Sequence, residues 1–257
     1  MKRIIILFLV SVLLLTTLTS CFTVKYITPQ DSSATAVSDE TTETLINTLA
    51  PRLLRANVVV SAAHYSLIEQ TTSQGSGVIF HTDAKYLYIL TNHHVVYCED
   101  ARRSVYTVRD AYDNTHTATL VVADASSDLA VVRITRNEAT ELLNVAQIAD
   151  ANAPIDTAVI SVGNPGGVHN SVSIGKIIYM KNIPNDELDI EVAYHTAPLE
   201  HGSSGGGIFD SDGNLVGINY AVGTDSETGR QMSFAVPVEA IRTFLAANGI
   251  VPTPSTK

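Results

Sequence analysis

The chain has 257 residues, 45% of them hydrophobic, with 16 Lys and Arg against 26 Asp and Glu and a formal net charge of −10. This length allows one large domain or two small ones with an ample apolar core. The acidic balance argues against nucleic acid as a partner, because phosphate binding needs a basic surface.

Residues 1–20 are expected to be a targeting segment. Two basic residues precede an apolar run from Ile4 to Leu15, which is too short with these flanks to predict a membrane span. The run ends in Leu18-Thr19-Ser20-Cys21, which resembles a bacterial lipobox, where the chain is cut before the Cys and its sulfur is acylated. An ordinary secretory signal with an incidental Cys is the alternative. We expect lipidation of Cys21 and an extracytoplasmic protein anchored to a bacterial membrane.

Cleavage before Cys21 removes two of the 16 basic residues and none of the 26 acidic ones, which leaves a net charge of −12. Attachment to a membrane must therefore come from the lipid itself and not from a polybasic surface. Cys98 is then the only remaining cysteine, so we expect no intrachain disulfide and interpret Cys98 as a small buried hydrophobic residue.

Residues 21–50 are predicted to be a flexible tether, because the segment is rich in Ser, Thr, Asp and Glu and poor in large apolar residues. A short helix is predicted within it over Asp39–Leu49, with Ser38 as its cap and Pro51 ending it.

From about Val58 to Val238, short apolar runs alternate with turns rich in Gly, Asn, Asp and Pro, as is typical of an all-β barrel or sandwich. The stretch Asn144–Ala153 divides the runs into two sets of about six. A closing helix is predicted over Pro237–Asn248, and residues 251–257 are expected to be a disordered tail. The predicted strands are Asn57–Ser61, Ser76–Phe80, Tyr86–Thr91, Ser104–Val108, Thr117–Val122, Leu129–Ile134, Thr157–Val162, Ser171–Met180, Leu188–Ala193, Gly207–Phe209, Leu215–Tyr220 and Ser233–Val236.

The segment Gly202-Ser203-Ser204-Gly205-Gly206 places a Ser in a Gly-rich turn, where the hydroxyl can project and backbone N–H groups can face a substrate. The pattern fits the G-x-S-x-G nucleophile elbow, but that arrangement needs a His after the Ser. His201 is the last histidine of the chain. The catalytic base must therefore precede Ser204, in the order His, Asp, Ser.

A base and an acid are found in that order, each at the edge of an apolar run. His93 and His94 follow the run that ends at Thr91, and Asp128 stands in a polar loop before Leu129. A Ser hydroxyl becomes a strong nucleophile when a base takes its proton, and the imidazole must be held in one tautomer by a carboxylate. These residues predict nucleophilic catalysis in a crevice between two sets of strands.

At these residues the sequence resembles the trypsin-like serine proteases, and most closely the bacterial HtrA/Deg group. The resemblance implies two six-stranded antiparallel β-barrels of the chymotrypsin type, over about 55–143 and 154–238, within a protease domain at 51–250. Seven motifs carry it in order: Gly75-Ser-Gly-Val-Ile79, Leu90-Thr-Asn-His-His-Val-Val96, Ser127-Asp-Leu-Ala-Val-Val132, Ser161-Val-Gly-Asn-Pro165, Gly202-Ser-Ser-Gly-Gly206, Leu215-Val-Gly-Ile-Asn219 and Ser233-Phe-Ala-Val-Pro237.

The family pattern Thr-Asn-x-His-Val implies that His94 is the base and that His93 is a neighbouring loop residue. Asp128 is then the orienting carboxylate and Ser204 the nucleophile. The backbone N–H groups of Gly202 and Ser204, with that of Ser203 helping, are implied to form the oxyanion hole. One departure is Ser203 itself, since Asn or Asp usually precedes the catalytic Ser, and a looser turn is the consequence to test.

The resemblance also implies a substrate pocket, formed by Pro198, His201, Ile218, Asn219, Tyr220, Ser233, Phe234 and Ala235. Its walls hold no carboxylate, so we expect a preference for small or medium aliphatic side chains. A preference for Glu assisted by His201, as in glutamyl endopeptidases, is the alternative. The remaining histidines are expected at surface or strand-end positions: His64, His81, His116, His169 and His195.

The predicted function is therefore that of a serine endopeptidase acting on unfolded or extracytoplasmic polypeptides, with no cofactor and no metal. A catalytically silent peptide-binding protein on the same fold is the alternative, and an esterase-like hydrolase is a third reading. We expect no PDZ domain in this chain, because about 20 residues follow Pro237. The resemblance leaves the oligomeric state open, with a trimer as a common form in the family.

Overall fold

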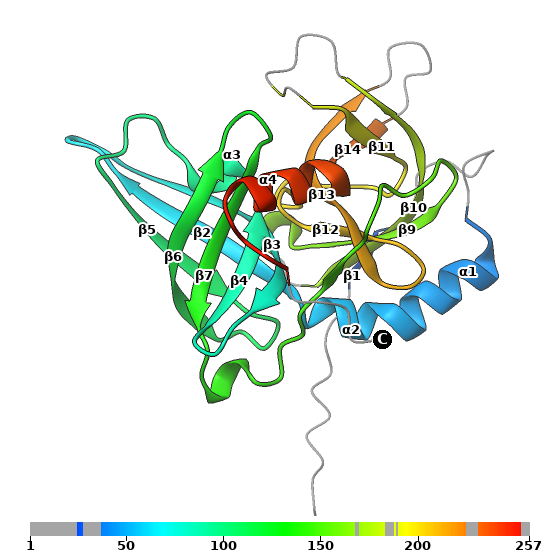
Figure 1. The fold of residues 1–257 in the computed structure, drawn as a ribbon, viewed down its shortest axis with the longest axis horizontal. Helices are drawn as coiled ribbons and strands as arrows, with labels where there is room; N and C mark the ends of the chain where they lie inside the picture. Colours follow the sequence, from blue (N-terminus) through cyan, green and yellow to red (C-terminus); the bar gives the residue numbers. More distant parts are fainter. Residues whose placement is uncertain are drawn as a thin grey trace, which may run out of the picture.

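The computed structural model describes residues 25–27, 37–167, 170–182, 188, 190–224 and 231–252. Within them the chain forms two β-barrels that lie side by side, with short helices packed around them (Figure 1). The N-terminal half of the chain builds one barrel and the C-terminal half the other, as the two sets of predicted strands indicated.

The first barrel closes in the strand order β2–β3–β4–β7–β6–β5, with every pair antiparallel. Alternate residues along each strand point inward, and Val60, Ile89 and Val132 are among the buried residues of its interior. The strands are β2 (Asn57–Tyr65), β3 (Gln70–Thr82), β4 (Tyr86–Thr91), β5 (Arg103–Arg109), β6 (Thr115–Asp124) and β7 (Leu129–Thr135).

The second barrel closes as β9–β10–β11–β14–β13–β12 and back to β9, again with antiparallel pairs. Two short strands add to it in parallel: β1 (Lys25–Ile27) to β10 and β8 (Gln147–Ile148) to β13. The prediction of two six-stranded antiparallel barrels is confirmed. The barrel strands are β9 (Ala158–Gly163), β10 (Ser171–Lys181), β11 (Val192–His195), β12 (Gly207–Phe209), β13 (Asn214–Thr224) and β14 (Gln231–Pro237).

One strand lies later in the chain than its apolar pattern indicated. The run Leu188–Ala193 predicted a strand, whereas β11 begins at Val192 and continues to His195. Its two partner strands decide this position, because β11 pairs with β10 from Val192 to His195 and with β14 from Ala193 to His195. The strand thus carries a histidine into the barrel wall.

The segment before β2 is helical and buried on one side. It comprises α1 (Asp39–Thr44), a π-helical turn (Leu45–Leu49) and α2 (Ala50–Leu54). Ser38 caps α1 by accepting a hydrogen bond from the Thr41 N–H at 3.2 Å. The helix does not end at Pro51 as predicted, because the π-helical turn lets Pro51 stand in the first turn of α2, where no intrahelical donor is needed.

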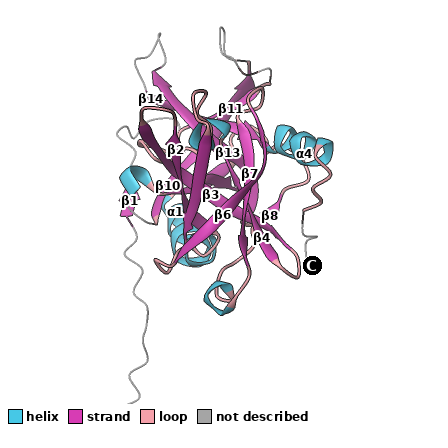
Figure 2. Ribbon diagram, turned by 90° about the vertical axis from the view of Figure 1, so that its left-hand side faces the viewer, coloured by secondary structure: helices cyan, strands magenta, loops and turns pink. Residues whose placement is uncertain are grey.

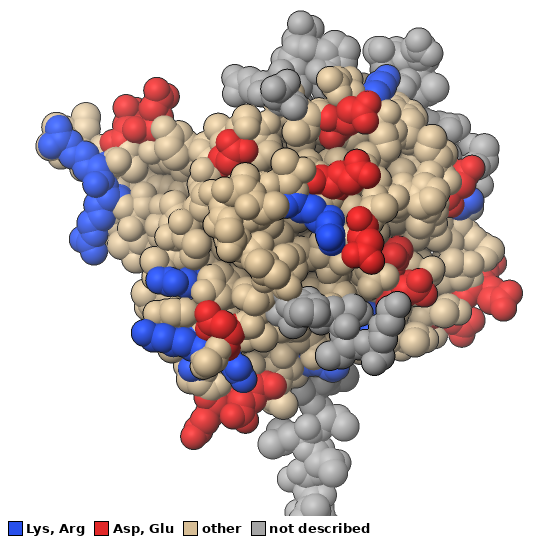
Figure 3. Space-filling view, viewed as in Figure 1, with Lys and Arg blue, Asp and Glu red and all other residues tan. Residues whose placement is uncertain are grey.

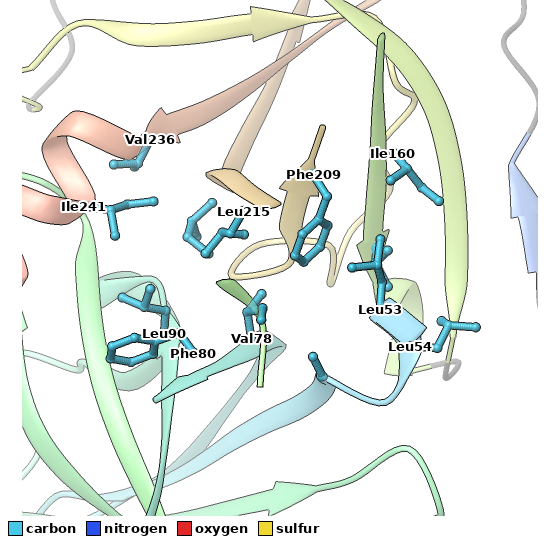
Figure 4. Close-up of a cluster of buried hydrophobic side chains, with 14 of the residues drawn as sticks. Leu53, Leu54, Val78, Phe80, Leu90, Ile160, Phe209, Leu215, Val236 and Ile241 are labelled. Carbon is cyan, nitrogen blue, oxygen red and sulfur yellow. The ribbon is translucent and has the colours of Figure 1, made fainter. Parts of the chain in front are cut away.

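A continuous apolar core joins the helical segment to both barrels (Figure 4). Leu53 and Leu54 of α2 lie in it beside Phe209 and Ile160 of the second barrel. The region predicted as a tether thus contributes Leu45 to the core and β1 to the second barrel.

The C-terminal helix α4 (Val238–Ala247) confirms the predicted closing helix. Pro237 stands at its N-cap and Gly249 follows it with φ of +66°. Its buried face includes Ile241, Phe244 and Leu245 and packs on the same core. Figure 2 shows α4 and β1 on opposite sides of the molecule.

Candidate active site

The histidine pair lies in α3 (His93–Val96), the short helix that follows β4. The Nδ1 atom of His94 lies 2.8 Å from Oδ2 of Asp128, and the backbone N–H of His94 donates to Oδ1 at 3.0 Å. A carboxylate on Nδ1 fixes the tautomer of a neutral imidazole, so that Nε2 carries the free lone pair. His93 instead stacks on Tyr97, with ring centroids 4.5 Å apart.

Asp128 is held in an unusual backbone conformation, with φ of +49°. Its carbonyl oxygen accepts from the Asn92 side chain at 2.9 Å and from the His93 N–H at 3.2 Å. Such left-handed residues persist where the surroundings hold them. Asn92 was not singled out from the sequence, although it stands in the same motif as the histidines.

Ser204 comes from the second barrel, in the turn before β12. Its hydroxyl donates to the Tyr220 carbonyl at 3.3 Å and makes no hydrogen bond to His94 within the described part of the chain. The turn nevertheless lies against the histidine helix. A Cβ added to Gly75 would lie 2.7 Å from Cγ2 of Val95 and 2.8 Å from the Ser204 carbonyl oxygen, so one glycine of β3 separates helix and turn.

Every carbonyl group of the turn from His201 to Ser204 accepts a hydrogen bond. The donors are Gly166 N–H for His201, the Ser76 hydroxyl for Gly202, Gly206 N–H for Ser203 and Ser76 N–H for Ser204, at 2.7, 2.7, 2.9 and 2.7 Å. Because the C=O and N–H of a trans peptide point in opposite directions, these bonds also fix where the N–H groups point.

Each of these carbonyl groups shares its peptide unit with the N–H of the following residue, so the four N–H groups concerned are those of Gly202 to Gly205. Two of the four, those of Gly202 and Ser204, have no acceptor among the described residues. The N–H of Ser203 is different, because it donates to the Glu200 carbonyl at 3.0 Å. The expectation that Ser203 helps in the oxyanion hole is therefore wrong, since its donor is already used. The Ser203 side chain is also engaged and accepts from the Glu200 N–H at 3.2 Å.

The structure does not bring all eight predicted pocket residues together. Asn219, Ser233 and Ala235 are buried on the inner side of the second barrel. Ile218 is packed in the core between the barrels and cannot line a pocket. Successive strand residues face opposite sides of a sheet, so Phe234 points away from Ser233.

The outward side of the same strands carries an aromatic cluster. Phe234 packs edge-on against Tyr194 with centroids 4.7 Å apart and lies 6.2 Å from the ring of Tyr220. Of the two remaining pocket candidates, Pro198 is partly buried and its carbonyl accepts from the Ser173 hydroxyl at 2.8 Å, whereas His201 is exposed.

His195 is the last residue of β11, a strand-end position as we expected, but it is fully buried. Its Nε2 lies 3.0 Å from Oδ1 of Asn219, whose amide group in turn donates to the Ser161 hydroxyl at 2.9 Å. Burial lowers the pKa of His195 to about 4. His64 and His116 stand one residue from an end of β2 and of β6, and they are also buried, with 3% and 9% of their surface exposed. His169 lies outside the described residues.

The predicted lipidation site, Cys21, lies outside the described residues as well. Among the residues that are described, no helix has the length and apolar character needed to span a membrane.

Comparison with known proteins gives a consistent result. Residues 75–218 match the trypsin-like peptidase domain. The chain is 35% identical over 191 residues to the putative serine protease HhoA of Synechocystis, which covers 70% of this chain and 45% of that protein. It is 33% identical over 174 residues to the serine endoprotease DegS of Haemophilus influenzae, covering 66% and 48%. The chain thus spans about half the length of these relatives.

Solved structures resemble the fold over most of the chain. The HtrA-type protease AlgW with a tripeptide has a TM-score of 0.63 at 24% identity, covering 82% of this chain and 63% of that one. An inactive mutant form of Rv3671c from M. tuberculosis has a TM-score of 0.62 at 22% identity, covering 84% and 96%. At these identities the likeness concerns the fold alone.

Proposed function

Because the chain belongs to the trypsin-like peptidase family, we propose that it is an HtrA-type serine endopeptidase with His94, Asp128 and Ser204 as its catalytic residues. The observation that carries the proposal is the two-point contact of Asp128 with the imidazole and the backbone of His94, at 2.8 and 3.0 Å. A carboxylate in this position leaves Nε2 of His94 as the basic atom.

In the proposed reaction, the Ser204 hydroxyl leaves the Tyr220 carbonyl and attacks the carbonyl carbon of a peptide bond. His94 Nε2 takes the hydroxyl proton, and Asp128 remains ionised and stabilises the imidazolium. The oxygen of the tetrahedral intermediate is stabilised by the N–H groups of Gly202 and Ser204. His94 then returns the proton to the leaving amine, and water hydrolyses the acyl-enzyme on Ser204 by the reverse sequence.

Labelling with a fluorophosphonate tests this proposal, because such a probe phosphonylates an activated serine. We expect one adduct, which mass spectrometry assigns to Ser204, and none in Ser204→Ala. A wild-type protein that binds peptides but neither reacts with the probe nor cleaves them would favour the catalytically silent alternative. Cleavage of simple esters without cleavage of peptides would favour the esterase-like reading.

For specificity, we propose that the pocket takes small or medium aliphatic side chains. The polar atoms of its buried candidates are bonded internally, Asn219 to His195 and Ser161, and the Ser233 hydroxyl to the Ala197 carbonyl at 2.8 Å. None of these groups offers a charge, and desolvating a Lys or Arg without a partner costs several kcal/mol, on the order of 3–5.

The cleavage sites in a denatured protein mixture, identified by mass spectrometry, decide the specificity. We expect most cuts after Val, Ala or Leu. The exposed position of His201 leaves a preference for Glu as the alternative. A majority of cuts after Glu would support that alternative, and a majority after Lys or Arg would contradict both readings.

For location, we propose an extracytoplasmic protein anchored through a lipid on Cys21. A related protein of Pseudomonas fulva, 32% identical over 170 residues, is described as a probable periplasmic serine endoprotease. Because β1 begins at Lys25, only Phe22, Thr23 and Val24 would separate the lipid from the second barrel. Four extended residues span at most about 14 Å, so the barrel would lie close to the membrane.

Fractionation of cells expressing the wild type and Cys21→Ser tests the anchor. We expect the wild type in the membrane fraction with an acyl mass on Cys21, and the variant without that mass. A soluble wild type without acylation would contradict the proposal.

Figure 3 shows both acidic and basic side chains on one face of the molecule. The formal net charge of −10 argues against nucleic acid as a partner, because phosphate binding needs a basic surface.

A further inference from the structure

Ser76 lies fully buried on β3, where the first barrel meets the nucleophile turn of the second. It makes four hydrogen bonds at short distances. Its N–H donates to the Ser204 carbonyl at 2.7 Å and its hydroxyl to the Gly202 carbonyl at 2.7 Å. The hydroxyl oxygen accepts from the Asn164 N–H at 2.8 Å, and the Ser76 carbonyl accepts from the Thr91 hydroxyl at 2.7 Å.

The hydrogen bond from the Ser76 hydroxyl holds the peptide plane between Gly202 and Ser203. The Gly202 carbonyl belongs to the peptide unit that joins Gly202 to Ser203, and this unit lies between the two N–H groups that have no acceptor among the described residues. This peptide unit carries the Ser203 N–H and shares its two Cα atoms with the flanking units, which carry the Gly202 and Ser204 N–H groups and are held through the His201 and Ser203 carbonyls. A rotation of the middle plane that the torsions of Gly202 and Ser203 did not compensate would change the directions of both flanking N–H groups. Gly202 has φ of +95°, a conformation in which glycine has wide freedom.

The support for Ser76 is itself rigid. The side-chain amides of Asn57 and Asn164 pair reciprocally at 2.8 and 3.1 Å, and the Asn164 amide also donates to the Val58 carbonyl at 2.8 Å. These groups are buried, so their hydrogen bonds do not compete with water. Ser76 therefore links the turn to a polar network that crosses from one barrel to the other.

We propose that Ser76 is a positioning residue for the oxyanion hole, which holds the Gly202 carbonyl so that the N–H groups of Gly202 and Ser204 stay directed at the reacting oxygen. The inference rests on the proposed serine endopeptidase function. Removing an oxyanion donor outright lowers kcat by about 10²–10³-fold. Losing only the group that orients the donors should cost less, and we expect kcat to fall by at least about tenfold in Ser76→Ala.

The test compares the full-length wild type with Ser76→Ala, Ser76→Cys and the control Thr82→Val. Thr82 is on the same strand, and its hydroxyl also donates to a carbonyl, that of Tyr86 at 3.2 Å, away from the turn. For each protein we measure kcat and KM on a peptide and the affinity of a peptide aldehyde, whose adduct with Ser204 places an oxyanion in the hole. The pH dependence of kcat/KM and the urea midpoint are measured as well.

We expect Ser76→Ala to lose at least about tenfold in both kcat and aldehyde affinity, with KM and the pH profile unchanged. The Cys variant should be intermediate, because a thiol is a weak donor. Unchanged kcat and aldehyde affinity in Ser76→Ala would overturn the inference while leaving the proposed function intact. If Ser76→Ala does not fold, unchanged kcat in Ser76→Cys would overturn it. A wild type that neither cleaves peptides nor reacts with the aldehyde would overturn the proposed function, and this inference with it.

Discussion

The buried histidine of the second barrel predicts how the stability of the protein depends on pH. An exposed His in the unfolded chain titrates near pH 6.5, whereas His195 in the folded protein has a pKa of about 4 because burial disfavours its charged form. Between these values the unfolded state binds a proton that the folded state does not. Stability therefore rises with pH in this window and is lost as the pH falls through it.

The size of the effect follows from the shift in the pKa of His195. About 2.5 pKa units correspond to about 3 kcal/mol, most of which should be lost between pH 7.5 and pH 4.5. In His195→Gln the side-chain amide can still donate to Asn219 but does not titrate. Urea unfolding of the wild type and this variant at both pH values measures the difference directly.

His64→Gln is the matched control for this experiment. His64 is also buried, and its pKa is lowered by burial, but both of its ring nitrogens are paired, with the Ser104 and Ser73 hydroxyls at 2.9 and 3.2 Å. We expect its substitution to change the pH dependence less than that of His195. If His195→Gln lost as much stability on acidification as the wild type does, the assignment of a buried neutral His195 would be refuted.

Three further substitutions test other parts of the structure. Asp128→Asn should lower kcat by about 10⁴-fold with little change in the urea midpoint, because an amide group can donate to Nδ1 of His94 and favour the wrong tautomer. Gly205→Ala should destabilise the protein by at least about 3 kcal/mol, because φ is +84° and the added Cβ would meet the Thr91 hydroxyl at 2.5 Å. Leu45→Ala should cost about 3 kcal/mol by leaving a cavity in the core, and urea unfolding measures both effects.

These predictions have controls in the same chain. Gly249→Ala shares a positive φ of +66° but meets no atom within 4 Å, so it should cost about 1 kcal/mol. Leu142→Ala removes a side chain that is 65% exposed and should change stability by less than about 0.5 kcal/mol. Equal costs for both glycines, or for both leucines, would contradict the packing described above. Full activity in Asp128→Asn would contradict the role of the carboxylate.

The strands of both barrels could be predicted because each is a short apolar run bounded by turn residues. The exception is β11, whose bounds follow its pairing with β10 and β14 and not its apolar character. For a related reason, the sequence did not predict that the helical segment before β2 packs on the core. Its composition is polar overall, and only tertiary contacts reveal that Leu45, Leu53 and Leu54 are buried.

The candidate catalytic residues could be identified from local motifs, but the network behind them could not. Ser76 and Asn164 are distant in the sequence, and nothing about a Ser or an Asn in these motifs predicts a hydrogen bond between the two barrels. The burial of His195 at the end of β11 could not be predicted, because a lone histidine is more often exposed and its partner Asn219 is 24 residues away. Too many residues were predicted to line the pocket, because consecutive strand residues such as Ser233-Phe234-Ala235 face alternate sides of the sheet.

The most direct test of the account is the value of kcat for Ser204→Ala, His94→Ala and His93→Ala on an unfolded protein substrate. The first two variants should each lose about 10⁴-fold or more, and combining them should add little, because the groups act as a unit. His93→Ala should keep most of its activity, because His93 stacks on Tyr97 and does not contact Asp128 through its ring. Retained activity in His94→Ala together with its loss in His93→Ala would contradict the central claim.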